Sequence, residues 1–203
     1  EVDRARAQMK AGLLMGLESS SSRAERLARL VSIWGVVPNL ADTIEKIDNV
    51  SVDSSPMWLQ SKLISIGLKP VNSLVDITNY VLHETGSPLH AYDYDKIEKS
   101  TLIIRRAKKN EVFQTLDSNK LNLSDDNLMI CDHNKALCLA GVMGGFDCSV
   151  NNKTKRIFLE SAYFNPSSVR KTSKQHGILS DSSYRFERGV DFNNCLFTLH
   201  RAA

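Results

Sequence analysis

Apolar and polar residues follow a helical period near the middle of the chain. Apolar side chains recur at three- and four-residue spacing there, which predicts a helix with one buried stripe made by Leu74, Ile77, Tyr80 and Val81. Asp76 and Asn79 lie off this stripe. Gly86 is expected to end the helix, and Pro88 restricts the direction in which the chain then delivers His90.

Three further helices are expected in the same part of the chain. Ser55 and Pro56 have the residue types of an N-cap and a first helical position, and Gly67 would end that helix, with Trp58 in its buried side. A second helix would begin after Asn165 and run to about Gln175. The last would begin near Asp191.

Short runs with strand character lie between these helices, at residues 101–107, 111–116, 120–123, 128–132, 136–142 and 156–164. Turn-forming residues at 117–119 and 133–135 predict that neighbouring runs pair as hairpins. Helices at both ends with strands between them indicate an α+β fold with a mixed or mostly antiparallel sheet and flanking helices.

The first fifty residues have a different pattern. Residues 1–35 are expected to form two helices separated by the four serines at 19–22, and a third short helix is expected over residues 41–47. A junction is placed near Asp53. The chain is thus divided into a helical N-terminal segment, residues 1–52, and a main domain, residues 53–203.

Composition supports a globular protein. Hydrophobic residues make up 42% and charged residues 24% of the 203 positions, which suffices for one good core. No apolar run reaches the ~18 residues that cross a bilayer, and the N-terminus has no signal-peptide character, so a cytoplasmic location without membrane contact is expected. The four cysteines are expected to be buried free thiols, and the spacing of cysteines and histidines predicts no metal site.

The net charge of +3 is too small for a protein that holds nucleic acid by electrostatics alone. The excess lies entirely in residues 53–203, and a basic group stands near the C-terminus: Arg170, Lys171, Lys174, Arg185 and Arg188. This group is either an ordinary solvated surface or part of a nucleic-acid contact.

Glu160 and a glycine-rich turn are the positions most suggestive of a site. Strand alternation puts Glu160 on the same face as Phe158 and Ala162, so its carboxylate should be buried and needs a partner, for which a buried arginine is the structural alternative. Gly141 and Gly144 allow close backbone approach, either for a ligand or for packing alone.

Five motifs in order, DITNYV, GSPLHAYD, LAGVMGG, LESAYF and SDSSYRFERGVD, resemble the B3/B4 region of bacterial phenylalanyl-tRNA synthetase β subunits. The resemblance covers about residues 54–203 and implies a fragment that lacks the strand before Pro56. Residues 1–35 instead resemble a helical, non-catalytic part of M16-family zinc peptidases. Together the two resemblances imply a possible chimera without peptidase activity, since the His-x-x-Glu-His signature is absent.

The synthetase resemblance implies an editing deacylase that hydrolyses tyrosine wrongly attached to tRNA(Phe). Glu160 would read the tyrosine hydroxyl, while Asn79 and His90 would hold the ester and the attacking water, with the role of His90 as base or positioner left open. The implied substrate-binding residues are Thr78, Gly141, Gly144, Gly145 and Ser182.

The same resemblance implies contacts beyond the pocket. The acceptor end of tRNA(Phe) would meet Arg170, Lys171, Lys174 and Arg188, and a synthetase α subunit would be the partner in an α2β2 enzyme. No cofactor is expected in this region, because ATP and magnesium would belong to the whole ligase. The alternative is a non-catalytic tRNA-binding or subunit-assembly module whose pocket is vestigial.

Overall fold

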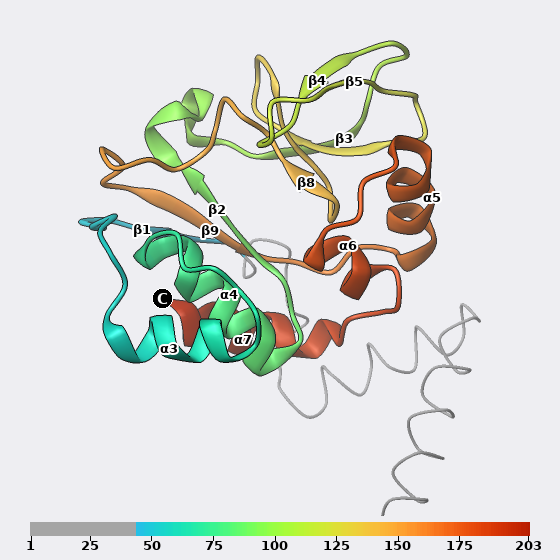
Figure 1. Ribbon diagram of the computed structural model, residues 1–203. Coiled ribbons are helices and arrows are strands. Elements are labelled where there is room, and N and C mark those ends of the chain that lie inside the picture. The colour runs from blue at the N-terminus through green and yellow to red at the C-terminus, as the bar shows by residue number, and fades with distance from the viewer. Residues whose placement is uncertain (1–43) are drawn as a thin grey trace, which may run out of the picture. The chain divides into compact units, whose positions relative to one another are not determined.

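The computed structural model describes residues 44–203 and confirms the α+β class (Figure 1). All strand pairings within these residues are antiparallel. The two helices expected in residues 1–35, and the segment that resembles M16 peptidases, lie outside the described residues and stay predictions.

A three-stranded sheet forms the middle layer. Its order is β1 (Ile44–Ile47), β9 (Ile157–Ser161) and β2 (Leu89–Asp93), so β9 is paired on both sides. One face of β9 packs against helices, because Ile157 and Leu159 share a core with Leu74 and Leu199. These two residues belong to α4 (Ser73–Thr85) and α7 (Cys195–Ala202), and α3 (Met57–Ser65) packs on α4.

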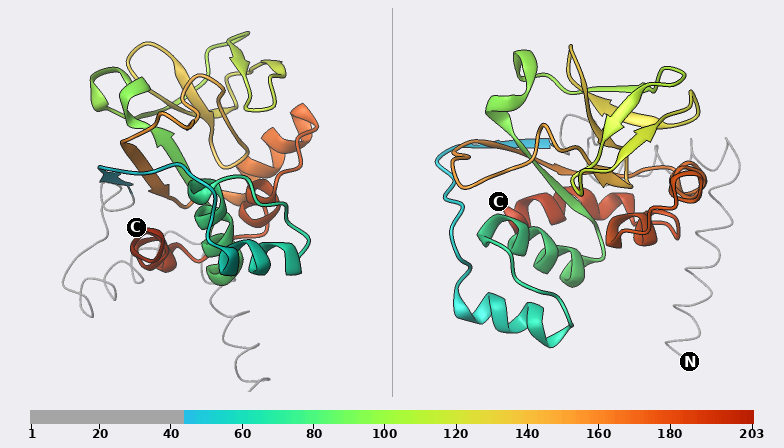
Figure 2. Two further views of the ribbon diagram at one scale, coloured as in Figure 1. Left: turned by 60° about the vertical axis from the view of Figure 1, so that its left-hand side comes forward. Right: turned by 45° about the horizontal axis from the view of Figure 1, so that its top comes forward.

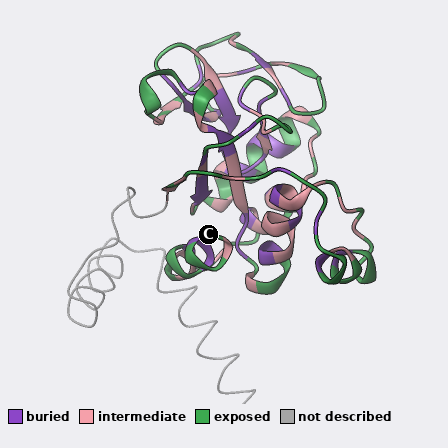
Figure 3. Cartoon of the chain, turned by 90° about the vertical axis from the view of Figure 1, so that its left-hand side faces the viewer, coloured by how far each residue is buried: buried purple, intermediate pink, exposed green. Residues whose placement is uncertain are grey.

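The other face of β9 meets the larger core. Phe158 and Ala162 pack there with residues of a four-stranded sheet, ordered β3 (Ile103–Arg106), β6 (Leu128–Cys131), β7 (Ala136–Leu139) and β8 (Met143–Gly144). The hairpin of β4 (Val112–Gln114) and β5 (Lys120–Asn122) lies beside it. Helices therefore cover one side of the middle sheet and strands the other (Figure 2), with buried positions concentrated between the layers (Figure 3).

The remaining helices follow β9. Helix α5 (Pro166–His176) begins as expected, with the Asn165 side chain accepting hydrogen bonds from the backbone N–H groups of Ser167 and Ser168. Helix α6 (Asp181–Phe186) was not predicted; it is capped by Ser180. Three 3-10 turns complete the described elements: η2 (Tyr94–Lys96), η3 (Glu98–Ser100) and η4 (Phe192–Asn194).

The prediction of a helix over residues 41–47 is wrong for residues 44–47, the part of this range that the structure describes. Residues 44–47 form β1, whose register with β9 runs from Ile44 opposite Glu160 to Ile47 opposite Ile157. This pairing satisfies backbone groups that a four-residue helix would leave free. A strand is thus present before Pro56, contrary to the expectation, and the proposed junction near Asp53 falls inside one packed unit, because Val52 is buried with Leu159.

Three expectations for α3 and α4 also need correction. Pro56, not Ser55, is the N-cap of α3, and the Ser55 hydroxyl instead donates to Asp76 Oδ2 at 2.5 Å. Asp76, expected on the polar side of its helix, is only 1% exposed and also accepts the Val71 N–H at 2.9 Å. Trp58 is 58% exposed and lies edge-on to Tyr80, because α3 buries Leu59 and Leu63 instead.

The expectation for the cysteines is confirmed, since all four are buried and unpaired. Among residues 44–203, no cluster of three or more His, Cys, Asp or Glu side chains is placed to hold a metal ion. Within the same residues, no helix has the length and apolar content that spanning a membrane would need.

Candidate functional site

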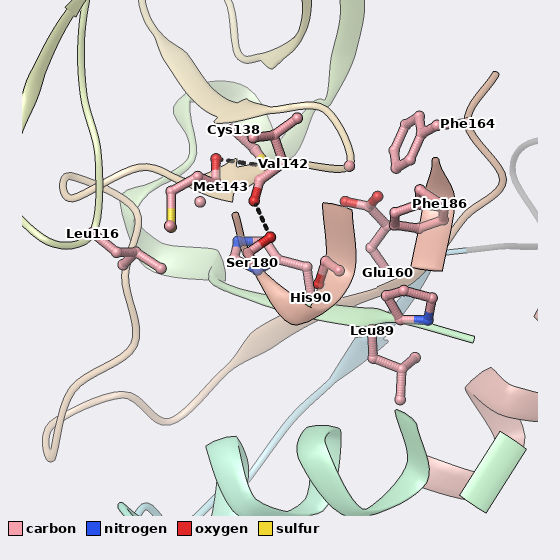
Figure 4. A pocket seen from close by; sticks show the side chains of 14 residues that line it. Leu89, His90, Leu116, Cys138, Val142, Met143, Glu160, Phe164, Ser180 and Phe186 are labelled. Carbon is pink, nitrogen blue, oxygen red and sulfur yellow. Dashed lines mark hydrogen bonds between the residues drawn. The ribbon is translucent and has the colours of Figure 1, made fainter. Parts of the chain in front are cut away.

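A pocket of about 150 Å³ opens beside the middle sheet (Figure 4). Strands β2 and β9 supply His90 and Glu160, the β7–β8 hairpin supplies Gly141 to Gly144, and the start of α6 supplies Ser182. Five of the sequence-predicted residues therefore converge on one cavity: His90, Gly141, Gly144, Glu160 and Ser182.

Glu160 is the buried carboxylate of this pocket. It is 5% exposed and stands on the large-core face of β9, as the alternation predicted, directly opposite His90 of β2. Its partner is not an arginine: the Tyr92 hydroxyl donates to Oε2 at 2.5 Å. Burial raises the pKa of Glu160 to about 7, although the hydrogen bond from Tyr92 acts in the opposite direction. Near neutral pH both protonation states of the carboxyl group are therefore populated.

His90 lies between Tyr92 and the glycine turn. The two rings meet edge to face, with centroids 4.4 Å apart and an interplanar angle of 84°. Burial lowers the pKa of His90 to about 4, so its imidazole is neutral at neutral pH. A neutral imidazole can accept a proton from water, which fits a base or a water-positioning group.

The three glycines are explained by close packing. A Cβ on Gly144 would stand 2.5 Å from His90 Cε1, and a Cβ on Gly141, whose φ is +70°, would stand 2.9 Å from Phe164 Cδ2. A Cβ on Gly145 would meet the Leu137 carbonyl oxygen at 2.5 Å, and this residue does not line the pocket. Close packing therefore accounts for glycine at all three positions, and Gly141 and Gly144 also line the pocket.

Ser180 holds the start of α6, which carries Ser182, against the β7–β8 turn. This role of Ser180 was not predicted from the sequence. Its hydroxyl donates to the Val142 carbonyl at 2.7 Å and accepts the Ser183 N–H at 3.0 Å, as part of a capping box. The serine-rich run at 180–183 carried the signal for this helix start. With α6 tied to the β7–β8 turn, Ser182 and Phe186 face the cavity one turn apart.

Thr78 and Asn79 are not among the pocket residues. Both lie on α4, which packs against the opposite face of the middle sheet through Leu74, and the Thr78 hydroxyl donates to the Val75 carbonyl at 2.8 Å. Their assigned place at the ester end stays a prediction.

The basic residues lie on α5 and just after α6. Arg170, Lys171, Lys174 and Arg188 are all exposed. Arg188 is paired with Glu187, to whose Oε1 it donates at 2.7 Å, and its Cζ lies over the Tyr184 ring, 3.5 Å from the ring centroid. Arg170 donates weakly to the Glu187 carbonyl oxygen at 3.5 Å. These side chains could meet a polyanion beside the pocket.

Comparison with known proteins gives the family. The chain is 50% identical over 161 residues to the phenylalanine-tRNA ligase beta subunit of Protochlamydia amoebophila, covering 79% of this chain and 20% of that protein. The same-named subunits of Bacteroides fragilis and Bacillus cereus are 46% and 45% identical over 157 and 173 residues, covering 77% and 85% of this chain and 19% and 22% of theirs.

The chain thus spans about a fifth of the length of these curated relatives. The model of the B3/4 domain family matches residues 42–203, a range that takes in β1, the pocket and every helix described above. The chain belongs to the B3/4 domain family.

Proposed function

We propose that this domain is the editing domain of a phenylalanine-tRNA ligase beta subunit. It hydrolyses the ester that joins a wrongly attached tyrosine to tRNA(Phe). The names of the relatives support the ligase context. Such a step is needed because an apolar pocket made for phenylalanine rejects an analogue with one added hydroxyl only poorly, by roughly 10²-fold in comparable synthetases.

The observation that carries the proposal is the setting of Glu160. Its carboxylate lines the pocket, is surrounded by apolar side chains such as Phe164 and Phe186, and already accepts one hydrogen bond from a phenol, that of Tyr92. Among the described residues nothing donates to its other oxygen, Oε1. The hydroxyl of a bound tyrosine would donate to this oxygen, whereas a bound phenylalanine would exclude water from it and leave it unpaired at a cost of ~1–3 kcal/mol.

Hydrolysis requires a water molecule beside the ester. Neutral His90 would hold this water or accept its proton as the oxygen attacks the acyl carbon. The carbon–oxygen bond to the terminal ribose then breaks, which releases tyrosine and restores the ribose hydroxyl. The exposed groups of Arg170, Lys171, Lys174 and Arg188 would meet the acceptor end of the tRNA, and an α subunit would complete the ligase.

The test is deacylation of Tyr-tRNA(Phe) and Phe-tRNA(Phe) by the 203-residue chain and its variants. Glu160→Ala should lower tyrosine release by roughly 10- to 100-fold, because a charge-assisted hydrogen bond is worth ~1.5–3 kcal/mol, while release of phenylalanine stays the same or rises. Glu98→Ala, which removes an exposed carboxylate outside the pocket, is the matched control.

His90→Ala should slow hydrolysis without reversing the preference for tyrosine. Circular dichroism must first establish that each variant is folded. If folded Glu160→Ala prefers tyrosine as strongly as the wild type, Glu160 is structural. If the folded wild type releases no tyrosine, the domain is a non-catalytic module of the ligase.

A further inference from the structure

Tyr92 lies directly behind the pocket and contacts both of its functional side chains. It follows His90 by two residues on β2, so strand alternation turns both rings to the same face of the middle sheet. Tyr92 is 0% exposed and does not line the cavity. Its hydroxyl donates to Glu160 Oε2, and its ring supports the His90 ring edge to face.

The presence of the Tyr92 hydroxyl in the core requires a physical explanation. A buried hydroxyl costs free energy unless it is hydrogen-bonded, and a phenylalanine would fill almost the same space without that cost. The hydroxyl donates to Glu160 Oε2 at 2.5 Å, and the buried Cys138 thiol of β7 is its other polar neighbour. The group therefore acts on the carboxylate, and the ring alone accounts for the packing.

We propose that Tyr92 is a positioning residue that holds Glu160 by Oε2 and so turns Oε1 toward the hydroxyl of the bound amino acid. This inference rests on the proposed function. The carboxylate then has two halves: Oε2 accepts from a phenol of the protein, and Oε1 is free to accept from a phenol of the substrate in the pocket. Selectivity then depends on a fixed carboxylate and not merely on a nearby negative charge.

The electrostatic surroundings of Glu160 give the hydroxyl a second effect. The titratable groups that face it are His90 and Tyr92 of β2 and Cys138 of β7, while β1 presents Ile44 across the strand and α6 presents Phe186. Burial keeps the thiol, the phenol and the imidazole uncharged near neutral pH. The hydrogen bond from Tyr92 therefore favours the ionised carboxylate without help from a neighbouring cation, and its removal should raise the pKa of Glu160.

The decisive variant is Tyr92→Phe, which removes one oxygen and keeps the ring against His90. Tyr94→Phe is the matched control, because Tyr94 packs against Phe158 outside the pocket. Two quantities are measured in the 203-residue chain: the titration midpoint of Glu160, by NMR of ¹³C-labelled glutamate carboxyls, and the ratio of tyrosine to phenylalanine release from the two charged tRNAs.

Tyr92→Phe should raise the Glu160 midpoint by about one pH unit or more and lower the tyrosine preference about tenfold at pH 7. The loss should shrink toward pH 8.5, after subtraction of uncatalysed hydrolysis, as the carboxyl group ionises. A merely structural role of Tyr92 would not move the midpoint. Tyr94→Phe should match the wild type in both measurements.

Two failures are distinguishable. A wild-type chain that releases no tyrosine overturns the proposed function and, with it, the role of Glu160 in recognising the tyrosine hydroxyl. An active wild type whose Tyr92→Phe variant keeps the same midpoint and preference overturns this inference alone. If Tyr92→Phe does not fold, the wild type still decides: with ¹³C at tyrosine Cζ, the Tyr92 signal should move at the Glu160 midpoint, and an unmoved signal refutes the coupling.

Discussion

Glu160 and His90 should make opposite contributions to the pH dependence of stability. The pKa of Glu160 rises from 4.5 to about 7 on folding, so its contribution is fully present below pH 4.5 and is lost as the pH rises toward 7. The pKa of His90 falls from 6.5 to about 4, so its contribution is present above pH 6.5 and is lost as the pH falls toward 4.

Each change spans about 2.5 pH units, which corresponds to roughly 3 kcal/mol because one unit is worth about 1.4 kcal/mol. Between pH 7 and pH 4 the two contributions therefore nearly cancel in the wild type. Glu160→Gln removes one of them and keeps the side-chain volume. The free energy of unfolding of the wild type minus that of Glu160→Gln should thus be about 3 kcal/mol larger at pH 4.5 than at pH 8.

Urea unfolding at pH 4.5, 5.5, 6.5 and 8 measures this difference, with the slope of the transition checked for constancy. Comparing two chains at each pH cancels the titration of all other groups. Glu98→Gln, the same substitution at an exposed position, gives the effect of the chemical change alone. A wild-type-minus-variant difference that stays within about 0.5 kcal/mol across this range would refute the buried, high-pKa carboxyl group.

Three further outcomes are expected. Gly144→Ala should displace the His90 ring, since its Cβ would lie 2.5 Å from Cε1, and so slow deacylation at least tenfold while leaving the tyrosine preference in place; a wild-type rate would contradict the tight contact. Replacing Arg170 and Lys171 with alanine should lower the slope of log affinity for tRNA against log salt by about two units, and an unchanged slope would assign both residues to an ordinary solvated surface. Asp76→Ala should cost about 1–3 kcal/mol of unfolding free energy in thermal or urea melts, because the buried Ser55 hydroxyl and the Val71 N–H lose their acceptor; a loss below 0.5 kcal/mol would argue that water replaces it.

Short-range sequence features determined the elements that depend on interactions between residues close together in the chain. The hairpins around residues 117–119 and 133–135 form where turn chemistry and strand alternation agree. Helix α5 begins after Asn165 because the side chain of this N-cap residue accepts from N–H groups only two and three residues further on. Alternation along β9 was also sufficient to place Glu160 on a buried face, since side chains on a strand change sides at every residue.

Tertiary structure decided everything that depends on partners distant in sequence. Residues 44–47 became a strand because β9 offered a free edge, and Trp58 remained exposed because α3 turned Leu59 and Leu63 toward α4. The partner of Glu160 is 68 residues away, on β2, and only the register of that strand pair brings the Tyr92 hydroxyl to the carboxylate. A side chain's face is set by its own strand, but its hydrogen-bond partner is set by which strand folds beside it.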